Sequence, residues 1–352
     1  MGAETIQKFQ FASDNTAGMC PEAMEAYVRA NQESVPSYGE DALTRRVTDK
    51  FRELFETDCE VFFVFNGTVA NALALASCCQ SYHSVICYEH AHILIAECGA
   101  AEFFSNGAKL IGAPGVNGKL TPAVISQIAD KCVDIHFHKP RVVSLTQGTE
   151  LGTVYQLEEL KEIRGAAARL KLLTHMDGAR FANSVASLNV APKALTWEAG
   201  VNVLSFGGTK LGLANTEAVV FFDRVLASEF EYRCKQAGQL ASKMRFHAAS
   251  WLAMLENDVW LKHAQHGNRC AALLASRLKK EADLTPAFPV ETNGVFLNLP
   301  RTLVQGLHAR GWVFHSFPGD TWRLMCSWQT TEADINALVS DFVDLQKKSP
   351  QP

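Results

Sequence analysis

A lysine at the end of a predicted strand is the first candidate for chemistry. The segment Ser205-Phe206-Gly207-Gly208-Thr209-Lys210 follows an apolar run that ends at Leu204. The two glycines leave the backbone without Cβ atoms just before Thr209 and Lys210. A lysine amine presented in this way can form a Schiff base when its pKa is lowered. Taken alone, the segment is more typical of an ordinary loop lysine.

An aspartate stands at the end of another predicted strand, in the segment Asp177-Gly178-Ala179-Arg180. In open α/β sheets, ligands bind in the crevice outside the carboxyl ends of the strands. A carboxylate there could hold a pyridine nitrogen protonated, because an ion pair at short range favours both charged forms. On its own, Asp177 is more typical of a helix N-cap.

A turn that could cradle a phosphate lies between a third strand and a helix. Asn66-Gly67-Thr68 follows the run Val61–Phe65 and precedes the apolar helical segment Val69–Cys79. Free backbone N–H groups and the helix dipole attract an anion at such a turn, and the hydroxyl of Thr68 can donate a hydrogen bond. Capping of the helix by Asn66 or Thr68 explains the same residues without a ligand.

The order of these segments is more informative than any one of them. Along the chain come a phosphate turn, an aspartate at a strand end and a lysine at a strand end. Together they could bind three parts of pyridoxal 5′-phosphate (PLP). The turn would bind the phosphate, the aspartate would pair with the pyridine nitrogen, and the lysine amine would react with the aldehyde carbon. We therefore expect one PLP site that contains Gly67, Thr68, Asp177 and Lys210.

The composition limits the class of protein. The chain has 352 residues, 47% hydrophobic and 20% charged, which suggests about two domains. A net charge of −4 with scattered basic residues gives no reason to expect nucleic acid or a membrane as a partner. The longest apolar stretch, Val69–Cys79, is shorter than the ~20 residues that span a bilayer. Ten cysteines without a C-x-x-C pair are typical of reduced thiols in the cytoplasm, and we expect no metal site.

Short apolar runs alternate with helical patterns through the middle of the chain. This predicts an α/β fold with a mostly parallel sheet covered by helices on both faces. Strands are expected at Val61–Phe65, Ser84–Tyr88, Lys109–Ile111, Arg141–Leu145, Leu172–Met176, Val201–Ser205 and Val219–Phe222. Helices are expected at Val69–Cys79, Pro122–Lys131 and Leu157–Leu170.

The last third of the chain has a different pattern, which begins with a long helical stretch, Arg245–Glu281, interrupted weakly at Gly267. A final helix starts near Thr331, where Thr331 and Asp334 have nearly the order of a capping box. Between them we expect a strand at Gly294–Leu299, a helix at Thr302–Arg310 and strands within Trp312–Trp328. We predict an N-terminal arm (residues 1–50), a large PLP-binding α/β domain (51–245), and a helical spacer with a small α+β domain (246–352).

From about Phe11 to about Phe342 the chain resembles the L-threonine aldolases, within the aspartate-aminotransferase-like (fold type I) PLP enzymes. The segments that carry the resemblance are Ser13-Asp14-Asn15, Tyr38-Gly39-Glu40-Asp41, Asn66-Gly67-Thr68, Glu89-His90-Ala91-His92-Ile93, Asp177-Gly178-Ala179-Arg180 and Gly208-Thr209-Lys210. Of these, Tyr-Gly-Glu-Asp and Asp-Gly-Ala-Arg are the most specific.

The resemblance implies a role for each matching residue. Lys210 would be the Schiff-base lysine, Asp177 the partner of the pyridine nitrogen, and His92 an imidazole that stacks on the cofactor and assists proton transfer. Without the resemblance, His92 is more typical of a structural histidine. The other matches would bind the cofactor (Gly67, Thr68, Thr209, Arg180 near the 3-oxygen, Arg245 from a neighbouring subunit) or the substrate (Tyr38, Arg180, and Ser13 with Arg323 on its carboxylate).

The chain departs from the commoner family pattern in two places. Many members carry a second histidine in a Glu-Asn-x-His segment, where this chain has Leu145-Thr146-Gln147-Gly148-Thr149-Glu150, with Thr149 at the position of the histidine. The form Ser-Phe-Gly-Gly-Thr-Lys also differs from the commoner Leu-Ser-Lys-Gly. Both departures resemble the low-specificity, phenylserine-aldolase-like branch, and they leave the preferred aldehyde and the threo or erythro selectivity open.

The reaction implied by the resemblance is cleavage of the Cα–Cβ bond of L-threonine, L-allo-threonine or a related L-3-hydroxy-amino acid to glycine and an aldehyde. The alternatives are β-elimination or transamination on the same scaffold, and a non-catalytic ligand-binding protein of this fold. A nicotinamide dehydrogenase is disfavoured because no G-x-G-x-x-G follows an early strand. Family members build each site from two subunits, so we expect a homo-oligomer, either a dimer or a tetramer.

Overall fold

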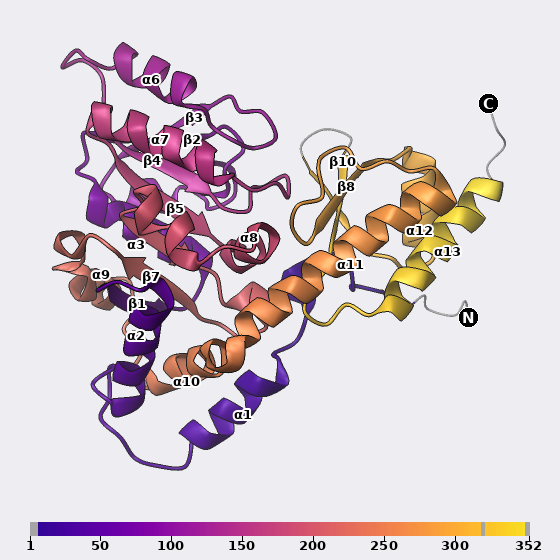
Figure 1. Ribbon diagram of the computed structural model, residues 1–352, viewed down its shortest axis with the longest axis horizontal. Coiled ribbons are helices and arrows are strands. Elements are labelled where there is room, and N and C mark those ends of the chain that lie inside the picture. The colour runs from indigo at the N-terminus through magenta and orange to yellow at the C-terminus, as the bar shows by residue number, and fades with distance from the viewer. Residues whose placement is uncertain (1–5, 318–320, 349–352) are drawn as a thin grey trace.

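Seven strands form the central sheet of the protein, whose computed structural model describes residues 6–317 and 321–348 (Figure 1). The strand order is β1-β7-β6-β5-β4-β2-β3. Strand β7 runs antiparallel to β1 and β6, and the other neighbouring pairs are parallel. The seven predicted strands are confirmed, as β1 (Glu60–Val64), β2 (His83–Tyr88), β3 (Lys109–Ala113), β4 (Lys139–Thr146), β5 (Leu173–Gly178), β6 (Val203–Phe206) and β7 (Glu217–Phe221).

Helices pack in two groups on the two faces of this sheet. Helix α3 contacts α5 and α9 in one group, while α6 contacts α7 in the other, which lies in front of the sheet in Figure 1. Helices α6 and α7 begin and end at the predicted residues, and α3 begins two residues earlier, at Gly67. The helices up to this point in the chain are α1 (Pro21–Ala30), α2 (Ala42–Phe55), α3 (Gly67–Cys78), α4 (His92–Ile95), α5 (Ala100–Phe104), α6 (Pro122–Lys131), α7 (Leu157–Leu170), α8 (Phe181–Leu188) and α9 (Phe230–Gln236).

The long helical stretch is broken at a different place from the one predicted. It forms α10 (Arg245–Leu255) and α11 (Val259–Ala282), separated where Asn257 and Asp258 adopt φ values of 55° and 56°. Asparagine and aspartate tolerate this left-handed conformation better than most residues. Gly267 is instead buried inside α11, where a Cβ atom would come within 3.4 Å of Asn293 Cβ. The prediction of a break at Gly267 is therefore wrong, because α11 continues through this glycine.

A small second unit lies at the far end of α11 (Figure 1). Its antiparallel sheet has the order β8-β10-β9, and residues 318–320, within the predicted strand region, lie outside the described residues. The predicted cap of the last helix is confirmed, since the N–H of Asp334 donates to Thr331 Oγ1 at 3.1 Å. The elements of this unit are β8 (Gly294–Asn298), α12 (Arg301–Ala309), β9 (His315–Ser316), β10 (Thr321–Met325) and α13 (Glu332–Lys348).

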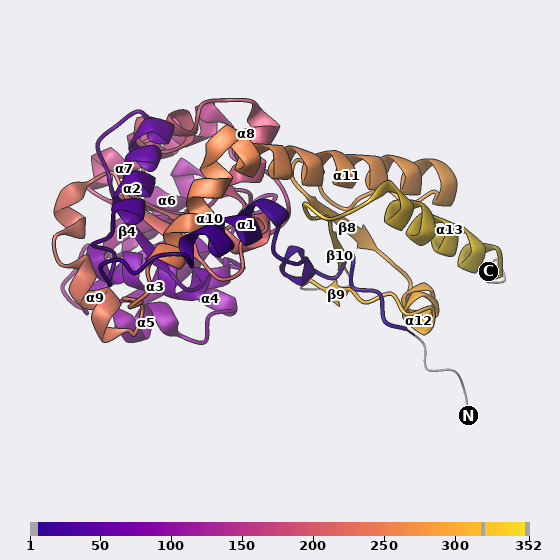
Figure 2. The ribbon, with the colours of Figure 1, turned by 90° about the horizontal axis from the view of Figure 1, so that it is seen from below.

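The N-terminal arm joins the two units. The N–H of Lys8 donates to Gly311 O at 2.7 Å, and the N–H of Met325 donates to Phe11 O at 3.0 Å, so the arm starts on the small unit. Helix α1 then packs on α10, and Figure 2 shows the chain crossing from β10 to this pair. Residues 13–15 therefore pass between the units.

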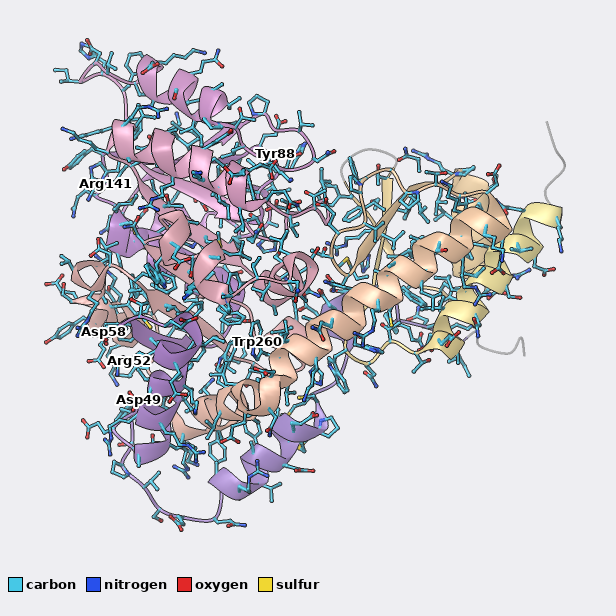
Figure 3. The ribbon with its side chains drawn as sticks, in the orientation of Figure 1. Asp49, Arg52, Asp58, Tyr88, Arg141 and Trp260 are labelled. Atoms are coloured by element: carbon cyan, nitrogen blue, oxygen red, sulfur yellow. The ribbon has the colours of Figure 1, made fainter. Side chains whose placement is uncertain are left out.

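Each unit has its own hydrophobic core. The larger core surrounds the central sheet and extends along α11 to Ala264, and the smaller one begins at Cys270. Trp260, labelled in Figure 3, anchors the start of α11 with its ring 5.8 Å from that of Phe206. The two cores support two units, and the boundaries at residues 50 and 245 stay predictions. Among the described residues, no helix is long and apolar enough to cross a membrane.

We expect Phe206→Ala to lower the free energy of unfolding by ~3–5 kcal/mol, because it leaves a cavity in a closely packed core. Phe206 is 0% exposed, and its ring lies 5.1 Å from those of Phe181 and Trp251. Urea denaturation at one protein concentration measures the change. Phe103→Ala, at a side chain that is 77% exposed, is the control and should cost less than ~0.5 kcal/mol. Equal losses in the two variants would contradict the prediction.

Candidate active site

A cavity of about 460 Å³ opens at the carboxyl ends of β5 and β6. This is the edge where open α/β sheets bind ligands, because the connections diverge there. The cavity brings together the phosphate turn, the aspartate and the lysine that the sequence singled out. Its lining residues include Asn15, Asn66, Gly67, Thr68, His92, Asp177, Ser205, Thr209, Lys210 and Glu217.

Asp177 is held rigidly at the end of β5. Its side chain is buried, with Oδ2 accepting a hydrogen bond from Asn71 Nδ2 at 2.9 Å and Oδ1 accepting one from the Ala179 N–H at 2.9 Å. The next helix, α8, begins at Phe181 with Arg180 as its N-cap. Capping therefore does not explain Asp177, and its carboxylate is available to the cavity.

His92 begins α4 and has a buried carboxyl group behind it. Its imidazole is half exposed, and Nδ1 lies 2.8 Å from Glu97 Oε1. The hydrogen bond to Glu97 raises the pKa of His92, although burial opposes the change. Burial also raises the pKa of the Glu97 carboxyl group, which is 4% exposed. The backbone N–H of His92 donates to Glu150 Oε1 at 3.2 Å, so two carboxyl groups fix this residue.

Lys210 lies in a single turn of 3-10 helix, Thr209–Leu211, at the cavity wall. Burial lowers the pKa of its amine, and the positive charge of Arg180 lowers it further. The charges of Asp14, Asp177 and Glu217 act in the opposite direction. A lysine with a lowered pKa is what nucleophilic attack on a carbonyl group requires.

The glycines before Lys210 are required by close backbone packing. A Cβ atom on Gly207 would lie 2.5 Å from Ala179 O, and one on Gly208 would overlap Thr216 O. The carboxylate of Glu217, on β7, accepts hydrogen bonds from the backbone N–H groups of Gly208 and Thr209. The turn that presents Lys210 is therefore fixed by neighbouring strands rather than free.

Arg180 and Asp14 form a buried ion pair beside Lys210. Arg180 Nε donates to Asp14 Oδ2 at 2.7 Å and Nη2 donates to Oδ1 at 2.9 Å. Asn293 Nδ2 also donates to Asp14 Oδ2, at 3.0 Å. Burial alone would raise the pKa of Asp14, but the charges of Arg180 and Lys210 and these hydrogen bonds lower it to about 2.

Arg323 lies close to this pair, on β10 of the small unit. It is partly buried, and its pKa is lowered by burial and by the positive charge of Arg180, with Asp14 opposing. An anion placed beside it would relieve both effects. Ser13, in the arm, lies next to Asp14, and its Oγ accepts a hydrogen bond from the Asn15 N–H at 3.2 Å.

Known proteins match this chain along most of its length. Residues 10–301 match the beta-eliminating lyase family. The low specificity L-threonine aldolase of Pseudomonas aeruginosa is 57% identical over 334 residues, which cover 95% of this chain and 96% of the relative. This chain belongs to the low-specificity L-threonine aldolases.

Two further proteins support the family and its fold. The low specificity L-threonine aldolase of a Pseudomonas species is 55% identical over 96% of this chain and 98% of the relative. A solved structure of Leishmania major threonine aldolase has a TM-score of 0.89 at 26% identity, and covers 95% of this chain and 98% of that chain. The resemblance and the fold type I class expected from the sequence are confirmed, and the family is one of PLP-dependent carbon–carbon lyases.

The residues around the cavity fit PLP chemically. A Cβ atom on Gly67 would meet no described atom within 4 Å, so the backbone of this turn faces open space. It begins α3, where Asn66 Oδ1 caps the Val69 N–H at 3.0 Å and the N–H groups of Gly67 and Thr68 are left to suit a phosphate. Asp177 offers a buried carboxylate, and Lys210 offers an amine with a lowered pKa.

Six predicted or substituted positions are not among the residues that line the cavity: Ser13, Arg180 and Arg323 lie around Asp14, whereas Tyr38, Arg245 and Thr149 pack elsewhere. Tyr38 packs its ring 4.8 Å below Lys235 Nζ, and Arg245 Nε donates to Ala30 O at 3.1 Å. The roles expected for Tyr38 and Arg245 stay predictions. Thr149 is buried and its hydroxyl lies 2.7 Å from Thr153 Oγ1, so it does not replace the missing histidine at the cavity wall.

Sequence reasoning assigned no role to several residues of the site, of which Asn71 and Glu97 bear most on the chemistry. Asn71 is a polar residue inside the otherwise apolar helix α3, and such a buried amide needs partners, which was a usable signal. Glu97 follows His92 by five residues, a spacing that does not predict a contact in a continuous helix. The two side chains meet because α4 ends after one turn, at Ile95. The others include Asp14, Asn15, Glu217 and Asn293.

We expect Asp14→Asn to lower the free energy of unfolding at pH 7 by ~3–5 kcal/mol, because it leaves Arg180 buried without its carboxylate. The pKa of Asp14 falls from an ordinary 3.8 to about 2 on folding. The ionised Asp14 carboxylate therefore contributes its whole stabilisation to the folded protein above about pH 4, and this stabilisation is lost as the pH falls toward 2. Urea titrations between pH 7 and pH 3 should show the difference from the unmodified protein shrinking below about pH 4.

Asp130→Asn is the matched control, since Asp130 is exposed on α6. It should leave the free energy of unfolding nearly unchanged across the same pH range. A difference between Asp14→Asn and the unmodified protein that stays constant down to pH 3 would contradict the assignment of the lowered pKa to Asp14.

Proposed function

We propose that the protein cleaves the Cα–Cβ bond of L-threonine, L-allo-threonine or a related L-3-hydroxy-amino acid to glycine and an aldehyde, with PLP held in the cavity described above. The observation that carries the proposal is that His92, Asp177 and Lys210 line one cavity at the carboxyl edge of the sheet. Relatives that are 55–57% identical over nearly the whole chain support the reaction class.

Four groups of the chain would hold PLP. The amine of Lys210 would bind its aldehyde carbon, and Gly67 and Thr68 would bind its phosphate through the first turn of α3. Asp177, fixed by Asn71 and by the Ala179 N–H, would keep the pyridine nitrogen protonated. When bound, PLP supplies an electron sink for the charge left on Cα as the bond breaks.

The cationic residues beside Asp14 would orient the substrate. Arg323 and Ser13 are suited to its carboxylate, since a guanidinium can donate two parallel hydrogen bonds. Arg180, already held by Asp14, would contribute positive charge near the ring of the cofactor and the substrate. A carboxylate fixed on this side leaves the β-hydroxyl group toward His92, which would accept its proton as the C–C bond breaks.

We also propose that the protein is a homo-oligomer, either a dimer or a tetramer, with sites completed across subunits. The positions of Tyr38 and Arg245 support this, because the two side chains line other hollows of their own chain, away from the residues around Asp14. The small amino-acid substrate needs no nucleic acid or membrane partner. The cysteine pattern supports a location in the cytoplasm.

An assay of product identity tests the function directly. The PLP-loaded protein is incubated separately with L-threonine, L-allo-threonine and L-phenylserine, and glycine, aldehyde, ammonia and keto acids are measured. Glycine and aldehyde in equal amounts support cleavage of the Cα–Cβ bond. Ammonia with a keto acid would instead indicate β-elimination, and a keto acid that depends on an added amino acceptor would indicate transamination. No product from any of the three would favour a non-catalytic protein.

We expect Lys210→Ala to abolish both glycine release and the visible absorbance band of lysine-bound PLP, because the variant has no amine at the cavity wall. Absorbance spectra and the glycine assay measure the two losses. Lys161→Ala is the control, at a lysine whose side chain is 75% exposed on α7, and both signals should persist. A Lys210→Ala protein that keeps the band would refute this residue as the anchor.

We expect Arg323→Gln to raise the KM for L-threonine by about 10–100-fold, since hydrogen bonds to charged groups contribute roughly 1.5–3 kcal/mol. The affinity for glycine should fall in parallel, because glycine shares the carboxylate. Steady-state kinetics with glycine as an inhibitor measure both constants. Arg301→Gln, at an exposed position of α12, should leave them unchanged. An unchanged KM in Arg323→Gln would exclude Arg323 from carboxylate binding.

A further inference from the structure

A continuous chain of polar side chains runs from the cavity wall to Asp177. His92 Nδ1 lies 2.8 Å from Glu97 Oε1, and Asn71 Nδ2 lies 3.0 Å from the same oxygen. Asn71 Nδ2 also lies 2.9 Å from Asp177 Oδ2. Glu97, Asn71 and Asp177 are 4%, 2% and 5% exposed, so water does not compete for these contacts.

We propose that Glu97 is the positioning residue for His92, and that Asn71 joins Glu97 to Asp177. Neutral His92 then carries its proton on Nδ1 and presents an unprotonated Nε2 to the cavity. The proposal deepens the proposed function, since it rests on His92 as the acceptor of the substrate hydroxyl proton. His92 is the residue that would touch the substrate, and Glu97 acts through it.

The hydrogen positions follow from the number of donors in the chain. The Asn71 amide has two hydrogens on Nδ2, one for Glu97 and one for Asp177, and the opposite orientation of the amide would place its oxygen against two carboxyl oxygens. Glu97 Oε1 therefore already accepts one hydrogen bond. An ionised Glu97 has no proton to donate, so its 2.8 Å contact with His92 is a hydrogen bond only if the proton lies on Nδ1.

The charged groups that face His92 decide how strongly it holds a second proton. Glu97 and Asp177 favour the charged imidazole, and Lys210 disfavours it. Glu150 contacts the backbone N–H of His92 rather than its ring. Glu97 makes the largest contribution, through its hydrogen bond, so replacing its charge should lower the pKa of His92. Glu97→Gln keeps the shape and an accepting oxygen while it removes the charge.

The experiment is NMR spectroscopy of the holoenzyme labelled with ¹⁵N-histidine, with the His92 signals identified by their loss in His92→Gln. In the unmodified protein, neutral His92 should show a proton on Nδ1 and none on Nε2. In Glu97→Gln its titration midpoint should fall by about one pH unit or more. The acidic limb of the kcat/KM profile should move to lower pH in the same variant, because the neutral imidazole is the acting form.

Glu158→Gln is the matched control, at a carboxylate whose side chain is 80% exposed on α7, and it should shift neither titration. A neutral His92 protonated on Nε2, or a titration midpoint unchanged in Glu97→Gln, overturns the proposal. If Glu97→Gln does not fold, the tautomer of neutral His92 in the unmodified protein decides alone whether the proposal stands. Failure of the proposed function is a separate result. The unmodified protein would then release no glycine, whichever ring nitrogen of His92 carries the proton.

Discussion

The buried ion pair between Asp14 and Arg180 connects the parts of the chain that make the site. Asp14 comes from the N-terminal arm, Arg180 from the turn after β5, and Asn293, which also donates to Asp14, precedes β8 of the small unit. Breaking such a buried pair is costly because one charge is left without its partner. The relative position of arm, sheet and small unit is therefore fixed at the place where substrate would bind.

The same pair shapes the electrostatics around it. Arg180, Lys210 and Arg323 bring three positive charges near one another in a chain whose net charge is −4. Asp14 neutralises part of this charge, and burial lowers the pKa of both Lys210 and Arg323. The guanidinium charges of Arg180 and Arg323 remain, and they favour an anion such as a carboxylate beside them.

Local patterns in the sequence predicted the scaffold well. The seven sheet strands are continuous apolar runs, and the phosphate turn, Asp177 and Lys210 each follow such a run, so their meeting at one sheet edge follows from topology. Contacts between distant residues were not predictable in this way. Ser13 was expected to act at the site, yet its neighbour Asp14 carries the ion pair, with a partner 166 positions away. The break in the long helical stretch was misplaced because helix propensity points to Gly267, whereas the helix is interrupted where Asn257 and Asp258 adopt positive φ values.

The arm that supplies Asp14 has a consequence for how the protein is made. Chains emerge from the ribosome N-terminus first, so Asp14 is synthesised long before Arg180 and longer still before Asn293. The large sheet, which ends with β7, can form while the arm has only Arg180 and its neighbours to bind, because the strands β8 and β10 beside it come later. The substrate side of the site is thus completed late, because the cofactor scaffold can fold before Arg323 has been synthesised.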